Sequence, residues 1–149
     1  MAAYFLDSSA VMTRSVQETG TVWVRALTAS GTGNFFYLAR ITDVEVTAAL
    51  ARRRGQAGLS VIQAVAALRQ FRRDFGQDYR VVEITIALLQ RAAQLADTHA
   101  LRGYDAVQLA VALDVHARDQ ALVLVSADAE LNAAATAEEL RVEDPNTHP

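Results

Sequence analysis

Short apolar runs alternate along this chain with longer stretches in which apolar residues recur every three or four positions. Short runs of this kind are typical of buried strands, whereas the longer spacing is typical of helices with one buried side. The pattern predicts five strands, at residues 3–6, 35–39, 79–84, 121–126 and 140–144, with the last at a sheet edge. Helices are predicted between them, at residues 18–30, 42–54, 61–75, 85–99 and 104–117, with shorter ones after residues 7 and 128. Strands separated by helices imply a parallel sheet that is covered on both faces.

Polar residues mark the starts of several of these helices. Thr42 and Glu45 have the spacing of a capping box, in which each side chain bonds to the backbone amide of the other residue. Ser60 is placed to cap the following helix. Asp105 opens a helix that is apolar on nearly every side, so a carboxylate starts a helix that belongs in the core. This combination makes Asp105 a candidate for chemistry as well as for helix capping.

The length and composition are those of one globular domain covering residues 1–149. The sequence contains no cysteine, which excludes disulfides and thiolate metal sites. No apolar run approaches the roughly 20 residues that span a bilayer, so no membrane partner is expected. The N-terminal residues lack the features of an export signal, and a cytoplasmic location is therefore the expectation. Residues 144–149 are expected to form a loose tail.

The net charge of −3 hides an uneven distribution of basic residues, all fourteen of which are arginine. Between residues 46 and 73 there are six arginines and no acidic residue: Arg52, Arg53, Arg54, Arg69, Arg72 and Arg73. Such a segment is either a solvated helix surface or a surface that binds phosphate, to which the planar guanidinium is well suited. The charge pattern by itself does not decide between the two.

Four acidic residues are placed where predicted strands end and predicted helices begin: Asp7, Glu45, Asp105 and Asp128. In an open parallel sheet these positions share one rim, where ligand sites form. Each residue alone is explained by a helix start. Four carboxylates in one cleft would repel each other and favour a cation between them. Oxygen ligands without cysteine suit Mg²⁺ or Mn²⁺ better than zinc.

Four segments carry a family resemblance: YFLDSSAVMTRSV, ITDVEVTAALARRR, LRGYDAVQLAVAL and LVSADAELNAAA. In order and spacing they resemble the four acidic motifs of PIN-domain ribonucleases, most closely the VapC-type toxins of type II toxin–antitoxin pairs. The similarity extends from about residue 3 to about residue 145. It implies a three-layer α/β/α PIN-like domain with a central parallel sheet of four to five short strands.

The resemblance also implies roles for individual residues. Asp7, Asp105 and Asp128 would hold one or two Mg²⁺ or Mn²⁺ ions, and Glu45 would complete the catalytic quartet by holding a water molecule or acting as a base. Ser9 and Ser126 match supporting hydroxyl positions beside the first and fourth acids. The reaction implied is hydrolysis of RNA, with tRNA as one candidate, leaving 5′-phosphate and 3′-hydroxyl ends. The six arginines would then follow the RNA backbone.

Partners and alternatives follow from the same resemblance. VapC-like proteins form homodimers and are silenced by a VapB-type antitoxin, so both are expected here. One alternative is a PIN-like module that binds RNA or protein without cutting. Another is a PIN nuclease of RNA processing that does not act as a toxin. Receiver domains and haloacid-dehalogenase-type phosphatases are excluded, because both need a lysine at the site and the chain has none.

Overall fold

Five parallel strands form one sheet in the order β3-β2-β1-β4-β5 in the computed structural model, which describes residues 2–56 and 58–149. The first strand of the chain lies at the centre of the sheet, where Tyr4 is in register with Phe36 on one side and Val123 on the other. The strands are β1 (Ala3–Leu6), β2 (Phe35–Ala39), β3 (Arg80–Val82), β4 (Val123–Val125) and β5 (Arg141–Glu143). This order places the ends of β1 and β4 side by side at one rim.

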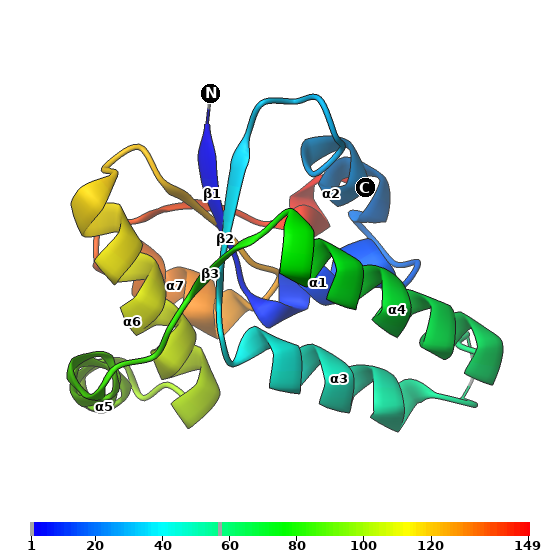
Figure 1. Ribbon diagram of the computed structural model, residues 1–149. Helices are drawn as coiled ribbons and strands as arrows, with labels where there is room; N and C mark the ends of the chain where they lie inside the picture. The colour runs from blue at the N-terminus through cyan, green and yellow to red at the C-terminus, as the bar shows by residue number, and fades with distance from the viewer. Residues whose placement is uncertain (1, 57) are drawn as a thin grey trace.

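Seven helices cover the two faces of the sheet within the described residues, as Figure 1 shows. One face is covered by α1 (Ser8–Ser15), α2 (Thr21–Leu27), α3 (Thr42–Arg53) and α4 (Val61–Gln77). The other face is covered by α5 (Ile86–His99), α6 (Gly103–Arg118) and α7 (Ala129–Ala137). Each face has its own cluster of buried apolar side chains, as parallel sheets require. The predicted three-layer α/β/α architecture with a parallel sheet is confirmed.

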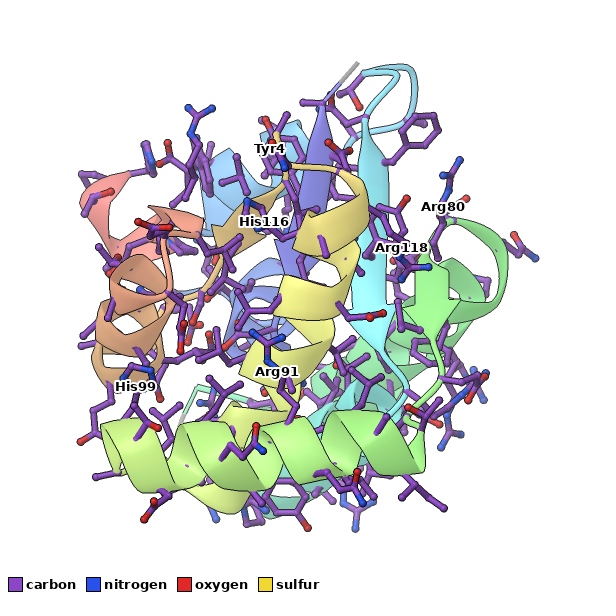
Figure 2. All side chains as sticks on the ribbon, turned by 90° about the vertical axis from the view of Figure 1, so that its left-hand side faces the viewer. Tyr4, Arg80, Arg91, His99, His116 and Arg118 are labelled. Carbon is purple, nitrogen blue, oxygen red and sulfur yellow. The ribbon has the colours of Figure 1, made fainter. Side chains whose placement is uncertain are left out.

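Helix α6 is buried on several sides because it is enclosed between the sheet and α5. Figure 2 shows α5 nearest the viewer, with Arg91 and His99 along it, and α6 behind it. Leu109, Val111 and Ala112 of α6 are fully buried. The nearly unbroken apolar sequence of this helix therefore has a structural cause. No helix among the described residues has the length and apolar composition needed to cross a bilayer.

Some predicted boundaries and caps are corrected by the structure. Helix α3 begins after Ile41, and no side-chain cap bond is made there, so the predicted Thr42–Glu45 capping box is wrong. Ser60 does cap α4, in a capping box with Gln63. The strand predicted at 79–84 is shortened to β3, and the helix predicted at 18–30 is shortened to α2, which starts after Gly20 in the left-handed conformation.

The C-terminal segment is ordered against α2, so the predicted loose tail over residues 144–149 is wrong. Pro145–Thr147 form a 3-10 helix whose first residue is buried. The His148 ring stacks on the Trp23 ring with centroids 4.1 Å apart. This short polar segment packs on apolar and aromatic side chains of α2, a contact that its own sequence does not predict.

Candidate functional site

Asp7 is the centre of the site, at the point where β1 ends and α1 begins. Its side chain caps α1 by accepting a hydrogen bond from the Ala10 backbone N–H at Oδ1, at 2.9 Å. The same oxygen accepts a bond from the Ser9 hydroxyl at 2.6 Å, and Oδ2 accepts one from the Ser126 hydroxyl at 2.9 Å. Only 2% of the residue is exposed. Asp7 therefore caps α1, and its buried carboxylate stays a candidate for the site.

Burial raises the pKa of the Asp7 carboxyl to about 7, well above its ordinary value near 3.8. The hydrogen bonds from Ser9, Ala10 and Ser126 lower it in part, and the negative charge of Glu45 raises it further. The charged form of a buried carboxylate is unfavourable unless it gains an opposite charge. A cation bound at Asp7 would supply that charge.

The hydroxyls of Ser9 and Ser126 connect Asp7 to the segment that follows β4. The Ala127 backbone N–H donates to Ser9 Oγ at 2.9 Å, and the Asp128 N–H donates to Ser126 Oγ at 3.1 Å. The structure thus brings together Asp7 and the two serines that the resemblance assigned to supporting positions. It also fixes the start of the segment that carries Asp128.

Glu45 lies in the first turn of α3 and is held by residues that the sequence analysis did not select. Its Oε2 accepts a hydrogen bond from the Ser8 hydroxyl at 3.0 Å, and its Oε1 accepts one from the Gln108 amide at 2.7 Å. Gln108 was the single polar residue in the apolar run of α6, which was the available signal. Ser8 directly follows Asp7, but the resemblance assigned a supporting role to Ser9 and none to Ser8.

Asp105 and Asp128 stand at the starts of α6 and α7. Asp128 caps α7 by accepting a hydrogen bond from the Leu131 N–H at 2.9 Å. Asp105 is half-buried, and its Oδ2 lies 3.9 Å from the Arg102 guanidinium Nε. Burial raises the pKa of the Asp105 carboxyl, and the nearby charges of Asp128 and Glu45 raise it further, while Arg102 lowers it. Negative charges from separate elements therefore act on one another at this rim.

The donor chemistry of the site fits a hard divalent cation, which prefers carboxylate and hydroxyl oxygens. The charge of Glu45 raises the pKa of Asp7 and of Asp105, and the charge of Asp128 also raises that of Asp105, so a cation would offset this repulsion. Within residues 2–56 and 58–149, no three Asp, Glu or His side chains lie close enough together to hold one metal ion. The fit is therefore one of donor type and charge.

A groove of about 460 Å³ opens beside Glu45, and it is lined by residues of α1, by residues along α3 and by Tyr104 at the start of α6. Glu45 lines it, as do Arg52 and Arg53 from the end of α3. Arg53 also lies 3.7 Å from Glu18, which lines the same groove. Tyr104 lines it from the start of α6 and is 58% exposed.

Two of the six predicted arginines, Arg52 and Arg53, thus reach the groove. Among the described residues that line it, the other four are absent: Arg54, Arg69, Arg72 and Arg73. Arg69, Arg72 and Arg73 are exposed on α4, and Arg54 is exposed just after α3. The predicted arginines therefore divide into two that line the groove with Glu45 and four whose surroundings do not distinguish them from solvated surface residues.

Comparison with known proteins gives no match to any established family profile. Two curated relatives, Ribonuclease VapC45 and Ribonuclease VapC49 from two strains of Mycobacterium tuberculosis, are each 36% identical over 142 residues. The match covers 95% of this chain and 95% of each relative.

Two solved structures share the fold. VapC20 of Mycobacterium tuberculosis, described as a Sarcin-Ricin loop cleaving toxin, has a TM-score of 0.65 at 21% identity, covering 88% of this chain and 94% of its own. VapBC-1 of nontypeable Haemophilus influenzae has a TM-score of 0.63 at 13% identity, covering 96% and 98%.

Proposed function

This chain belongs to the VapC family of ribonucleases, and we propose that it is an endoribonuclease that depends on a divalent cation. The observation that carries the proposal is the set of four carboxylates at the rim of the sheet, where the charge of Glu45 raises the pKa of Asp7 and of Asp105. The four acids come from distant parts of the chain: Asp7 follows the central strand, Glu45 and Asp105 lie on α3 and α6, and Asp128 caps α7. Their arrangement costs energy without a positive charge, and the metal-dependent cleavage of RNA supplies a reason for it.

Asp7, Asp105 and Asp128 would hold Mg²⁺ or Mn²⁺. When bound, the cation would lower the pKa of a water molecule and offset the charge that builds on the phosphate during hydrolysis. Glu45 would orient that water or accept its proton, because it lines the groove and is fixed on both oxygens. Ser9 and Ser126 would keep the Asp7 carboxylate in place.

The groove beside the acids would receive the RNA. Arg52 and Arg53 would contact phosphates on one side of the groove, and Tyr104 would offer an exposed ring for stacking against an unpaired base. A groove of this size accommodates a splayed strand better than a regular duplex, so loops of structured RNA are the expected targets. Transfer RNA and the Sarcin-Ricin loop that VapC20 is described as cleaving are the first such targets to test.

The cellular role that we propose is that of the toxin in a VapBC-type pair. A VapB-type antitoxin would cover the groove and could place an arginine among the acids, since carboxylates bind guanidinium strongly. The active form would be a homodimer in the cytoplasm. Exposed apolar side chains on α4, including Ile62 and Val65, are candidates for the dimer surface. Size-exclusion chromatography with light scattering tests the dimer, and co-expression with the neighbouring gene product tests the antitoxin.

A cleavage assay with two variants tests the enzymatic proposal. Wild type, Asp105→Asn and Asp97→Asn would be incubated with end-labelled total tRNA and ribosomal RNA fragments, in Mg²⁺, Mn²⁺ or EDTA. We expect cleavage by wild type and Asp97→Asn with metal, and none by Asp105→Asn or in EDTA. Asp97 is an exposed carboxylate on α5 and serves as the matched control.

The Asp105→Asn variant is expected to fold, because Asp105 is not the cap of α6. Arg102 occupies the cap position, and no side-chain cap bond is made there. Cleavage by Asp105→Asn at the wild-type rate would overturn the metal assignment. Absence of cleavage by folded, partner-free wild type under every condition would favour a module that binds RNA or protein without cutting.

A further inference from the structure

Glu45 is held from two sides by neutral donors, and each donor lies close in sequence to a proposed metal ligand. Ser8 directly follows Asp7 and donates its hydroxyl to Oε2 at 3.0 Å. Gln108 lies one helical turn after Asp105 and donates its amide to Oε1 at 2.7 Å. The carboxylate of α3 is therefore tied to α1 and to α6 at the two points where those helices carry Asp7 and Asp105.

Gln108 makes these contacts from an environment that is otherwise apolar. Only 1% of it is exposed, and its neighbours Leu109 and Ala110 belong to the core. Its Nε2 donates one hydrogen to Thr42 Oγ1 at 3.0 Å and the other to Glu45. Its Oε1 is buried and has no hydrogen-bond partner among the described residues. An unpaired buried acceptor is unfavourable, so an apolar side chain would fill this space better if filling space were its only role.

The orientation of the Gln108 amide follows from its partner. If the amide were reversed, its oxygen would face the Glu45 carboxylate, and two acceptors would repel each other. Because Nε2 gives both of its hydrogens away, Oε1 of Glu45 acts as an acceptor. With Ser8 on the other oxygen, the carboxylate is held in one orientation beside the groove.

We infer that Gln108 is a positioning residue for Glu45. It holds this general base at a fixed place relative to the proposed metal ligands. This inference rests on the proposed ribonuclease function and deepens it. Ser8 bonds to the other oxygen of Glu45 and has the same role, and we call Gln108 and Ser8 together the Glu45 clamp. Displacement of the base by about 1 Å costs up to about a hundred-fold in rate, so loss of the Gln108 bond should lower kcat while leaving RNA binding intact.

A double-mutant cycle tests whether Gln108 acts through Glu45. Wild type, Gln108→Met, Glu45→Ala and the double variant would be assayed on end-labelled total tRNA with Mn²⁺, with thermal unfolding as the fold check. We expect Gln108→Met to lower kcat by about ten- to a hundred-fold with KM within about two-fold of wild type. In the Glu45→Ala background the same substitution should have no further effect. Gln94→Met, on the exposed surface of α5, should match wild type.

A spectroscopic measurement reads the clamp without cleavage. The Gln108 side-chain amide would be identified in ¹H–¹⁵N spectra of metal-free protein by its loss in Gln108→Met. We expect one of its protons downfield of the other glutamine amides, as a bond to a carboxylate requires, and shifted upfield in Glu45→Ala. An unshifted amide in wild type overturns the inference, as does equal loss of kcat in both backgrounds of the cycle.

The two failures are distinguishable. If Glu45→Ala leaves no measurable rate, the chemical shift of the Gln108 amide alone decides whether Gln108 positions Glu45. If wild type cuts no RNA, the same shift decides that question, and the absence of cleavage counts against the proposed function. If cleavage occurs and Gln108→Met retains the wild-type kcat, the function stands and the positioning role is wrong.

Discussion

The Ser126 hydroxyl donates a hydrogen bond to Oδ2 of Asp7 at 2.9 Å, although the two residues are 119 positions apart in the chain. The bond joins the ends of the adjacent parallel strands β1 and β4. Because Ser126 is fully buried and Asp7 nearly so, this contact lies beneath the surface of the site. The buried bond to Ser126 thus holds the Asp7 carboxylate in place at the ends of β1 and β4.

Asp7→Asn should stabilise the metal-free protein at alkaline pH. The Asp7 carboxyl has a pKa of about 7 in the folded state and near 3.8 when exposed. Between these values the folded state binds a proton that the unfolded chain does not, so the free energy of unfolding falls as the pH rises from about 4 to about 7. Each pKa unit corresponds to about 1.4 kcal/mol, so the penalty at pH 8 is at most a few kcal/mol. The neutral Asn variant avoids it.

Urea unfolding in EDTA at pH 4, 6 and 8 measures this effect. The advantage of Asp7→Asn over wild type should be largest at pH 8 and disappear near pH 4. Asp97→Asn, which changes an exposed carboxylate on α5, should follow wild type throughout. A constant difference between Asp7→Asn and wild type at all three values would show that Asp7 is ionised normally in the fold.

Divalent cations should raise the stability of wild type at pH 8. A ligand that binds only the folded state adds about 2.7 kcal/mol at one hundred times its Kd. We expect Mn²⁺ and Mg²⁺ to raise the thermal unfolding temperature, EDTA to reverse the rise, and Asp105→Asn to reduce it strongly. An equal rise in Asp105→Asn and wild type would place the ion elsewhere, because a nonspecific effect does not depend on one carboxylate.

Arg52→Ala should weaken RNA binding more than Arg72→Ala. Arg52 lines the groove beside Glu45, whereas Arg72 is exposed on α4 outside that lining. Loss of one phosphate contact on a single strand reduces the slope of log affinity against log salt by about 0.7. Fluorescence anisotropy with labelled RNA loops, using the Asp105→Asn background to prevent cleavage, measures both quantities. Equal effects of the two substitutions would point to a diffuse electrostatic surface.

Gly20→Ala should destabilise the fold more than Gly31→Ala. Both glycines have positive φ, at 84° and 87°, so alanine is strained at either position. At Gly20 the added Cβ would also lie 2.3 Å from the Pro145 carbonyl oxygen, whereas nothing lies within 4 Å at Gly31. We expect about 1 kcal/mol for the backbone strain alone and about 1–3 kcal/mol more at Gly20 for the clash. Similar unfolding midpoints for the two variants would mean that the segment around Pro145 moves away from the added Cβ without a loss of stability.

The sequence predicted the strands well because parallel strands buried on both faces appear as short, wholly apolar runs. Val123–Val125 is the clearest example. The positions of the four acids followed from the same reasoning, since strand ends and helix starts share a rim. Glu45 was placed correctly on α3 but for a wrong local reason, because its carboxylate bonds to Ser8 and Gln108 and makes no capping box.

What the sequence could not reveal are contacts between segments distant in the chain. Gln108 looked like an exception in a core helix, and its partners Thr42 and Glu45 lie more than 60 positions away. The stack of His148 on Trp23 likewise depends on where α2 lies, which no local pattern encodes. Periodicity reports how much of an element is buried, but it does not report which neighbour covers it.

The central position of β1 has a consequence for the order in which the protein is made. A ribosome makes Ala3–Leu6 long before it makes β4, which lies beside this strand in the sheet. Until then Asp7 lacks Ser126 and Asp128, so a nascent chain carries only part of the acidic centre. Pairing between such distant segments is also slow to form. The proposed site therefore requires a chain synthesised at least as far as Asp128.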